Sequence, residues 1–176
     1  PLYNEADNVE RFVAELLAVL RRLGEPFEIV LVDDGSTDDT WRRIQDAARR
    51  EPALRGLSLM RNFGHQSALL AGLAQATGRA VISMDGDLQH PPEVIPELLA
   101  AWREGVRIVH TRRLDSRETG FEFEVEMITT AIRAGMAIDW VPIRTIYAGE
   151  SSHIRPVHHV SNFLRVAREA RRTVRT

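Results

Sequence analysis

The feature that most constrains the fold is an alternation of short apolar runs with segments of helical periodicity. The apolar runs cover residues 27–32, 57–60, 79–84, 107–111 and 137–143. Runs of this length are typical of strands that are buried on both faces. Strands that alternate with helices form a mostly parallel sheet with helices on both faces, and its ligand crevice lies at the carboxyl ends of the strands. The sequence therefore predicts an α/β, Rossmann-like fold.

Helical periodicity is clearest over residues 7–23, where we expect Asp7 to be the N-cap and Gly24 to end the helix. Further helices are expected over residues 39–50, 65–76, 92–104, 122–134 and 157–174. The last of these helices and the residues just after it carry five arginines close to an apolar stripe, at positions 165, 168, 171, 172 and 175. Such a helix is suited either to an anionic membrane surface or to packing on the sheet with a solvated face.

Length and composition limit the classes of function. A chain of 176 residues with 44% hydrophobic residues can bury one sizeable core. Its 23 basic and 25 acidic residues give no overall attraction to nucleic acid, so we expect no such partner. There is no cysteine, which excludes disulfides and thiolate metal sites. No apolar run approaches the ~20 residues that span a bilayer, so the sequence as given predicts a soluble or peripheral protein.

Two carboxylates, Asp85 and Asp87, follow the apolar run 79–84 and flank Gly86. Two like charges this close repel each other unless a cation neutralises them. Hard divalent ions such as Mg²⁺ or Mn²⁺ take oxygen ligands of this kind, together with substrate phosphates and water. Gln89 can add a neutral oxygen. The alternative is that Asp85 caps the following turn and Asp87 is solvated.

A second acidic strand end follows the run 27–32. Asp33 and Asp34 can accept hydrogen bonds from a nucleobase edge or a ribose, and Gly35 permits close approach of a backbone. The alternative is an N-cap for the next helix, with Ser36, Thr37 and Asp38 competing for that role. Both interpretations can hold. Two acidic strand ends on one sheet edge favour a nucleotide diphosphate bound through a metal.

Four ordered motifs give a specific resemblance. The segments PLYNE (1–5), VDDGSTD (32–38), RNFGHQ (61–66) and DGDLQHPPE (85–93) resemble the motifs of inverting family 2 glycosyltransferases with the GT-A fold. The resemblance is closest to the branch of dolichyl-phosphate mannose synthase and the polyprenyl-phosphate glycosyltransferases. It implies transfer of a sugar from a UDP- or GDP-sugar to a polyprenyl or dolichyl phosphate with inversion. The later segment VPIRTIYAGESSH (141–153) also resembles that branch.

The resemblance assigns roles residue by residue. It implies that Pro1, Tyr3 and Glu5 hold the nucleoside and that Asp33 reads the base. It further implies that Asp85 and Asp87 form the catalytic pair and, with Gln89, bind the metal and the donor diphosphate. The segment of Ser151, Ser152 and His153 would lie near the same diphosphate.

The remaining charged candidates are Arg61 and His65. Arg61 can pair with a diphosphate or form an ordinary surface salt bridge. His65 can contact phosphate or cap the helix that starts there. An acceptor that is already a lipid phosphate is anionic, so the reaction has less need of a strong general base.

The chain also departs from the family pattern. The family has a strand before the proline that is Pro1 here, and it has a further stretch near residues 111–127. We therefore expect a GT-A domain over residues 1–156, truncated at the N-terminus and shortened in the middle, with a basic helix over 157–176. A non-catalytic nucleotide-sugar-binding module stays open as an alternative. A nucleotidyltransferase is a second one, although the chain has no lysine to stabilise attack on a triphosphate.

The expected setting follows from the acceptor. A lipid phosphate places the protein at the inner face of the cytoplasmic membrane, in peripheral contact with it. A homo-oligomer is possible on the sequence alone.

Overall fold

A computed structural model describes residues 1–106, 108–113 and 138–143 of the chain. The chain divides into two compact units, Pro1–Leu99 and Ala100–Thr176. Each unit is described by itself. The domain boundary expected at residues 156 and 157 lies outside the described residues, as do the helices expected over 122–134 and 157–174.

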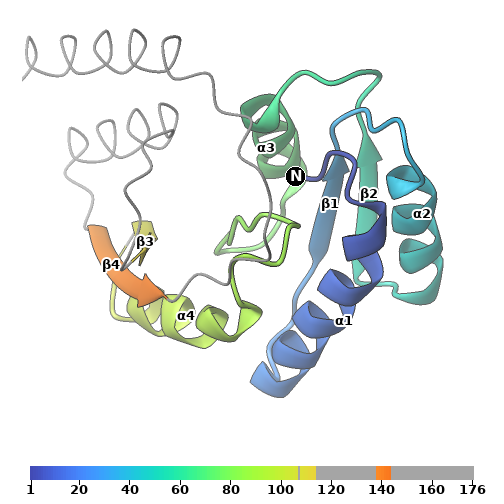
Figure 1. The fold of residues 1–176 in the computed structure, drawn as a ribbon. Helices are drawn as coiled ribbons and strands as arrows, with labels where there is room; N and C mark the ends of the chain where they lie inside the picture. The colour runs from blue at the N-terminus through green and yellow to red at the C-terminus, as the bar shows by residue number, and fades with distance from the viewer. Residues whose placement is uncertain (107, 114–137, 144–176) are drawn as a thin grey trace, which may run out of the picture. The chain divides into compact units, whose positions relative to one another are not determined.

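The first unit is built on two parallel strands, β1 (Ile29–Asp33) and β2 (Leu54–Ser58), which lie side by side in Figure 1. Their register pairs the first residues of the two strands with each other, and likewise the last, so that Asp33 is opposite Ser58. Four of the five residues of β1 are buried, as expected for a strand covered on both faces. The parallel pairing predicted from the alternation is confirmed.

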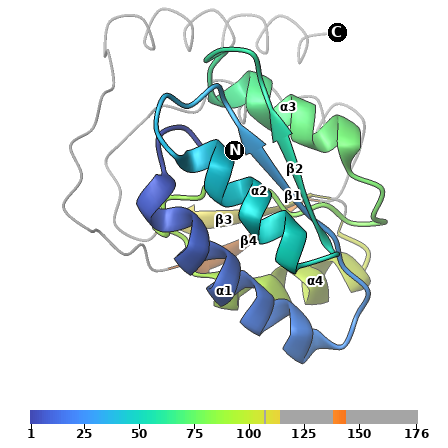
Figure 2. The same ribbon diagram turned by 90° about the vertical axis from the view of Figure 1, so that its right-hand side faces the viewer.

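Helices cover both faces of this strand pair. The helices α1 (Ala6–Leu23) and α2 (Thr40–Arg50) lie on one face, and α3 (His65–Gln75) lies on the other (Figures 1 and 2). The core lies chiefly between β1 and the first two helices, because α1 turns its apolar stripe inward. The buried residues of α1 are Val9, Phe12, Val13, Leu16 and Val19.

The ends of α1 test two expectations about capping. Gly24 ends the helix with φ of 68°, and its N–H donates to the carbonyl of Arg21 over 3.4 Å, so the expected stop is confirmed. The expectation for Asp7 was wrong, since the N-cap position is Glu5 and Asp7 lies within the first turn. The helix begins earlier because the backbone N–H of Ala6 finds an acceptor in Asp38, in the loop after β1, and that of Glu5 finds one in Thr40, the first residue of α2.

Two expected strands differ in the structure. The second strand covers Leu54–Ser58 rather than 57–60, and Met60 is 99% exposed. Residues 79–84 form no strand at all. A strand needs a ladder of backbone partners. On the edge of β1 opposite β2 the pairing among the described residues is a single bridge between Leu2 and Asp33, so residues 79–84 have no ladder there. The alternation of side chains persists nevertheless, since Ile82 and Met84 pack against the core while Val81 is exposed.

The helix expected over 92–104 begins with a different geometry. It opens as a 3-10 turn, η1 (Pro92–Val94), and continues as α4 (Ile95–Arg103). Pro92 suits the first turn because its missing N–H has no helical acceptor there. Ile95 is 2% exposed and belongs to the core of the first unit.

In the second unit the described strands are β3 (Ile108–Arg113) and β4 (Ile138–Ile143), which pair in parallel with Ile108 opposite Ile138. Residues 114–137 between them are long enough for the crossover that parallel strands require. The strands expected near 107–111 and 137–143 are thus confirmed. The described strands form two separate two-stranded sheets rather than one ladder. Within the described ranges, no helix combines the length and the apolar character that crossing a bilayer requires.

Candidate functional site

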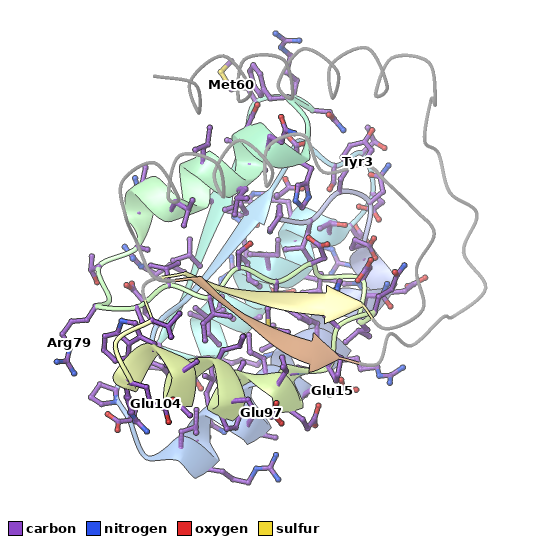
Figure 3. All side chains as sticks on the ribbon, turned by 90° about the vertical axis from the view of Figure 1, so that its left-hand side faces the viewer. Tyr3, Glu15, Met60, Arg79, Glu97 and Glu104 are labelled. Carbon is purple, nitrogen blue, oxygen red and sulfur yellow. The ribbon has the colours of Figure 1, made fainter. Side chains whose placement is uncertain are left out.

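The candidate site lies at the carboxyl end of β1. Leu2 lies alongside this end, where its N–H donates to the carbonyl of Val32 over 2.7 Å and its carbonyl accepts the N–H of Asp34 over 2.8 Å. Figure 3 shows Tyr3 and Met60 near this end of the strand pair and Arg79 toward the opposite end. The first residues of the chain therefore contribute directly to the edge where the acidic motifs were expected.

Residues 1–6 form several hydrogen bonds with the segment that follows β1. The side chain of Asn4 accepts the N–H of Thr37 over 2.9 Å, and the N–H of Asn4 donates to Ser36 Oγ over 2.9 Å. The N–H of Glu5 donates to Thr40 Oγ1 over 2.8 Å. These hydrogen bonds account for much of the polar composition of both motifs. They also hold Asn4 at φ of 54°, a left-handed conformation that asparagine tolerates.

Asp33 and Asp34 are buried, with 1% and 3% of their surface exposed. The carboxylate of Asp33 accepts the N–H of Ser36 over 3.0 Å and the hydroxyl of Ser58 over 2.9 Å. That of Asp34 accepts the N–H of Phe63 over 2.8 Å and the N–H of Gly64 over 2.9 Å. The structure thus gives both carboxylates partners within the protein. Their contact with a nucleobase or ribose stays a prediction.

Gly35 has φ of 66°, where a side chain is strained. The close approach that it permits is to the backbone of Arg61 and Asn62, since a Cβ here would come within 2.2 Å of the carbonyl carbon of Arg61. Arg61 lies over the ring of Phe63, with 4.4 Å from the guanidinium carbon to the ring centroid. A role for Arg61 in binding a diphosphate stays a prediction.

The turn at residues 85–87 packs against the start of the chain. Gly86 is buried, and a Cβ there would come within 2.8 Å of the Leu2 side chain. Asp85 has a side chain that is 44% exposed, and its Oδ1 lies 3.7 Å from Nε2 of His65. Asp85 and Asp34 both lie close enough to the nitrogen of Pro1 to interact with it electrostatically. Asp85 therefore lies near both Pro1 and the first residue of α3.

Asp87 is half-buried, and its Oδ1 accepts the N–H of Gln89 over 2.9 Å. This hydrogen bond closes a tight turn in which Leu88 has φ of 61°. The sequence alternative in which Asp85 caps a turn therefore fits Asp87 better than Asp85. A second role for Asp87 is still open, because a carboxylate offers several acceptor positions.

The donor set of this turn suits a hard divalent cation. Two carboxylates separated by one glycine supply oxygen ligands, which Mg²⁺ and Mn²⁺ prefer. Among the described residues no group of three acidic or histidine side chains is arranged to hold a metal by itself. Binding of a cation by Asp85 and Asp87 stays a prediction. Gln89 as a further ligand stays a prediction.

The other expected site residues are distributed as follows. Tyr3 is 44% exposed at the carboxyl end of β1, and Glu5 accepts the side-chain amide of Asn8 over 2.6 Å. Ser152 and His153 lie outside the described residues. The structure thus brings together Pro1, Asp34 and Asp85. Sequence reasoning missed the hydrogen bonds of Asp34 to residues 63 and 64 and the proximity of His65 to Asp85, because the partners are far apart in the sequence.

The family model for glycosyl transferase family 2 matches residues 1–168. The chain belongs to this family. It is 48% identical over 120 residues to the uncharacterized glycosyltransferase sll0501 of Synechocystis sp., an alignment that covers 68% of this chain and 38% of that protein. It is 38% and 40% identical to the undecaprenyl-phosphate 4-deoxy-4-formamido-L-arabinose transferases of Proteus mirabilis and Klebsiella pneumoniae. Each alignment covers 69% of this chain and 37% of the relative.

This member of family 2 spans less than two fifths of the length of these relatives. The crystal structure of S. aureus TarS 1-349 overlays on it with a TM-score of 0.47 and 28% identity, over 68% of this chain and 36% of that one. A score of that size is too low to establish a shared fold. The family membership therefore rests on the sequence match, and the α/β architecture rests on the parallel strands and helices of the chain itself.

Proposed function

We propose that this chain carries the donor-binding part of a glycosyltransferase that moves a sugar from a UDP- or GDP-sugar to a polyprenyl phosphate, with inversion. The observation that carries the proposal is the family 2 match over residues 1–168. Two relatives are named as transferases that act with undecaprenyl phosphate, which supports a lipid-phosphate acceptor. The acidic turn at the carboxyl end of β1 supports a nucleotide diphosphate as the donor, because that is where α/β sheets bind ligands.

Asp85 and Asp87 would hold Mg²⁺ or Mn²⁺ in this function. When bound, the ion neutralises the negative charge that grows on the leaving diphosphate. The half-exposed carboxylate of Asp85 is accessible to such a ligand, whereas the carboxylates of Asp33 and Asp34 are buried and hydrogen-bonded. In this proposal Asp85 contacts the ion, and Asp33 and Asp34 stabilise the fold in addition to any contact with the donor.

The acceptor sets the proposed location. A polyprenyl phosphate lies in a membrane, so the protein would contact the inner face of the cytoplasmic membrane peripherally. Its anionic phosphate oxygen attacks the sugar carbon from the face opposite the leaving group, and that in-line geometry gives inversion. An already ionised nucleophile needs no side chain to remove a proton.

Calorimetry with the 176-residue chain tests the donor site. We expect UDP or GDP to bind in the presence of Mn²⁺ and to bind far more weakly without it. Asp87→Ala should abolish the metal-dependent part of the heat. The matched control is Asp46→Ala on α2, because the side chain of Asp46 is 38% exposed and forms a surface ion pair with Arg49. The metal assignment is wrong if Asp87→Ala binds the metal and nucleotide as the unchanged chain does.

Turnover is measured separately with a UDP-sugar or GDP-sugar and a polyprenyl phosphate. Formation of the glycosylated lipid supports the transferase proposal. Metal-dependent nucleotide binding without any turnover supports instead a nucleotide-sugar-binding module. The two experiments together distinguish a failed donor site from a failed acceptor site.

A further inference from the structure

We infer that Asp34 is a positioning residue that anchors residues 61–64 and thereby places His65 beside Asp85. The inference deepens the proposed function and rests on it, since Asp85 is the proposed metal ligand. It concerns how the chain holds that ligand's neighbour in place. The segment 61–64 is called the anchored loop below.

The first step is the contact between Asp34 and the anchored loop. Each carboxylate oxygen accepts one backbone N–H of this loop: Oδ1 accepts that of Phe63 over 2.8 Å, and Oδ2 accepts that of Gly64 over 2.9 Å. Hydrogen bonds to an ionised carboxylate are stronger than those between neutral groups. With 3% of its surface exposed, Asp34 makes these bonds where water competes little.

The second step is that apolar burial does little to hold the anchored loop. Its other hydrogen bonds are short-range, since Asn62 Oδ1 also accepts the N–H of Gly64 over 3.0 Å and Ser67 Oγ donates to the carbonyl of Phe63 over 3.1 Å. Arg61, Asn62 and Phe63 are exposed, and Met60 just before them is 99% exposed. Apolar burial therefore contributes little to fixing the loop on β1. The backbone of Arg61 lies against Gly35, where a side chain would leave it no room.

The third step is that the position of the anchored loop determines where α3 begins. Gly64 has φ of 94° and immediately precedes the helix, and its carbonyl accepts the N–H of Ser67 over 3.0 Å and of Ala68 over 3.2 Å. The start of α3 is thus fixed by the residue whose N–H binds Asp34. His65 is the first residue of that helix, so a shift of Gly64 moves it directly.

The fourth step is the contact between His65 and Asp85. Nε2 of His65 lies 3.7 Å from Oδ1 of Asp85, and both side chains are nearly half exposed. An exposed carboxylate samples several rotamers unless a neighbour limits them. Residues that contact a metal ligand without touching the metal orient that ligand and alter the metal affinity. Asp34 therefore acts on the proposed metal site through the anchored loop and His65.

This role differs from direct recognition of the nucleoside by Asp34. Each carboxylate oxygen has a second acceptor position. The two amide donors fix the orientation of the carboxylate within the protein itself. The positioning role is therefore separate from any contact that Asp34 makes with the donor.

The test compares Asp34→Asn with Asp38→Asn in the full 176-residue chain. Asp38 belongs to the same loop, and its carboxylate accepts the N–H of Thr40 over 2.9 Å and of Ala6 over 3.2 Å. The same chemical change there affects the starts of α1 and α2 and leaves the anchored loop untouched. Asparagine keeps the shape of aspartate but places an N–H₂ group against one of the two donors.

The first readout needs no nucleotide. We expect Asp34→Asn to accelerate hydrogen exchange at the amides of Phe63 and Gly64 by about tenfold or more, relative to Asp38→Asn. At a fixed pH, Asp85→Asn should shift the ring resonances of His65 in the unchanged chain. The same substitution should leave them unshifted in the Asp34→Asn background. Equal exchange in the two asparagine variants, or an equal His65 shift in both backgrounds, overturns the inference.

The second readout is the Mn²⁺-dependent affinity for UDP or GDP, corrected for the folded fraction. We expect Asp34→Asn to weaken it about tenfold and Asp38→Asn to leave it nearly unchanged. Because Asp34 acts through His65, combining Asp34→Asn with His65→Ala should cost little more than the more severe single change. Additive losses would show that Asp34 acts independently of His65. A chain that binds no nucleotide overturns the proposed function, and the exchange and resonance measurements then decide the positioning role alone.

Discussion

Two acidic loops of this protein look alike in sequence and differ in structure. In VDDGSTD (32–38) the adjacent carboxylates are buried and accept hydrogen bonds from the protein itself. In SMDGDLQ (83–89) the carboxylate of Asp85 is 44% exposed and has His65 as its neighbour. Acidic residues that follow an apolar run can thus stabilise the fold or face solvent. The donors that surround them decide which.

The physical cause of the difference is the coverage of each loop. Asp33 ends a strand that pairs with β2 on one edge and with Leu2 on the other, so backbone and hydroxyl donors approach it from several sides. Residues 79–84 have no such ladder, and the turn after them packs on the rest of the first unit through Gly86 against Leu2 and through Leu88 on the core. The second loop is therefore more accessible.

The largest expected effect is that of Gly35→Ala in the loop VDDGSTD (32–38). Both Gly35 and Gly24 have left-handed φ, but a Cβ meets the backbone of Arg61 at 2.2 Å in the first case and nothing within 4 Å in the second. We expect Gly35→Ala to lower the free energy of unfolding by about 4 kcal/mol or more. Gly24→Ala should lower the free energy of unfolding by only about 1–2 kcal/mol, because the left-handed backbone conformation is then the only unfavourable change. Urea denaturation measures both, and equal losses would remove the close contact from the explanation.

The next effect compares an aspartate from each loop. Asp33→Ala leaves the N–H of Ser36 and the hydroxyl of Ser58 without their buried acceptor, which should cost about 3 kcal/mol of unfolding free energy. Asp85→Ala removes a half-exposed contact and should change stability by less than about 0.5 kcal/mol. Thermal and urea unfolding of the two variants gives the difference. A similar loss in both would show that the two loops share one structural role.

The smallest expected effect concerns Glu28. Its carboxylate accepts hydrogen bonds from Thr77, at the start of the segment that leads to the loop of residues 83–89. Hydrogen bonds from the backbone and then the hydroxyl of Thr77 are the main causes that lower the pKa of Glu28 to about 2, with Arg55 adding to them. The ordinary value is 4.5, so this stabilisation is complete above that pH and is lost as the pH falls toward 2.

Stability of the unchanged chain and of Glu28→Gln, measured from pH 6 to pH 2.5, tests that sign. We expect the unchanged chain to be the more stable of the two at pH 6 and the difference to shrink as the solution is acidified. Glu15→Gln on the exposed side of α1 is the matched control. A difference that grows in acid would contradict the depressed pKa of Glu28.

Periodicity predicted the helices of the first unit well, because burial of an apolar stripe is a local property of the sequence. Gly24 was found for the same reason, as a left-handed residue after the last apolar position. The strand at 54–58 was placed three residues late, since Arg55 and Gly56 break the apolar pattern although β1 supplies a full set of partners. The reverse error occurred at 79–84, where the pattern is apolar and the partners are missing.

The candidate site divides in the same way. The sequence singled out Asp33, Asp34, Asp85 and Asp87 from their positions after apolar runs, and the structure places the first three near the carboxyl end of β1. The bonds from residues 63 and 64 to Asp34 were not foreseen, because they join segments about 30 residues apart in the chain. Local spacing holds no information on such a pairing.

The sequence by itself determined the α/β class, the family and the acidic residues available for chemistry, since each depends on patterns within a short stretch of chain. Only the tertiary structure decided which carboxylates are satisfied internally and which stay accessible. The reason is that the free energy of a carboxylate depends on the donors and the solvent around it. Those are supplied by residues that come together only when the chain folds.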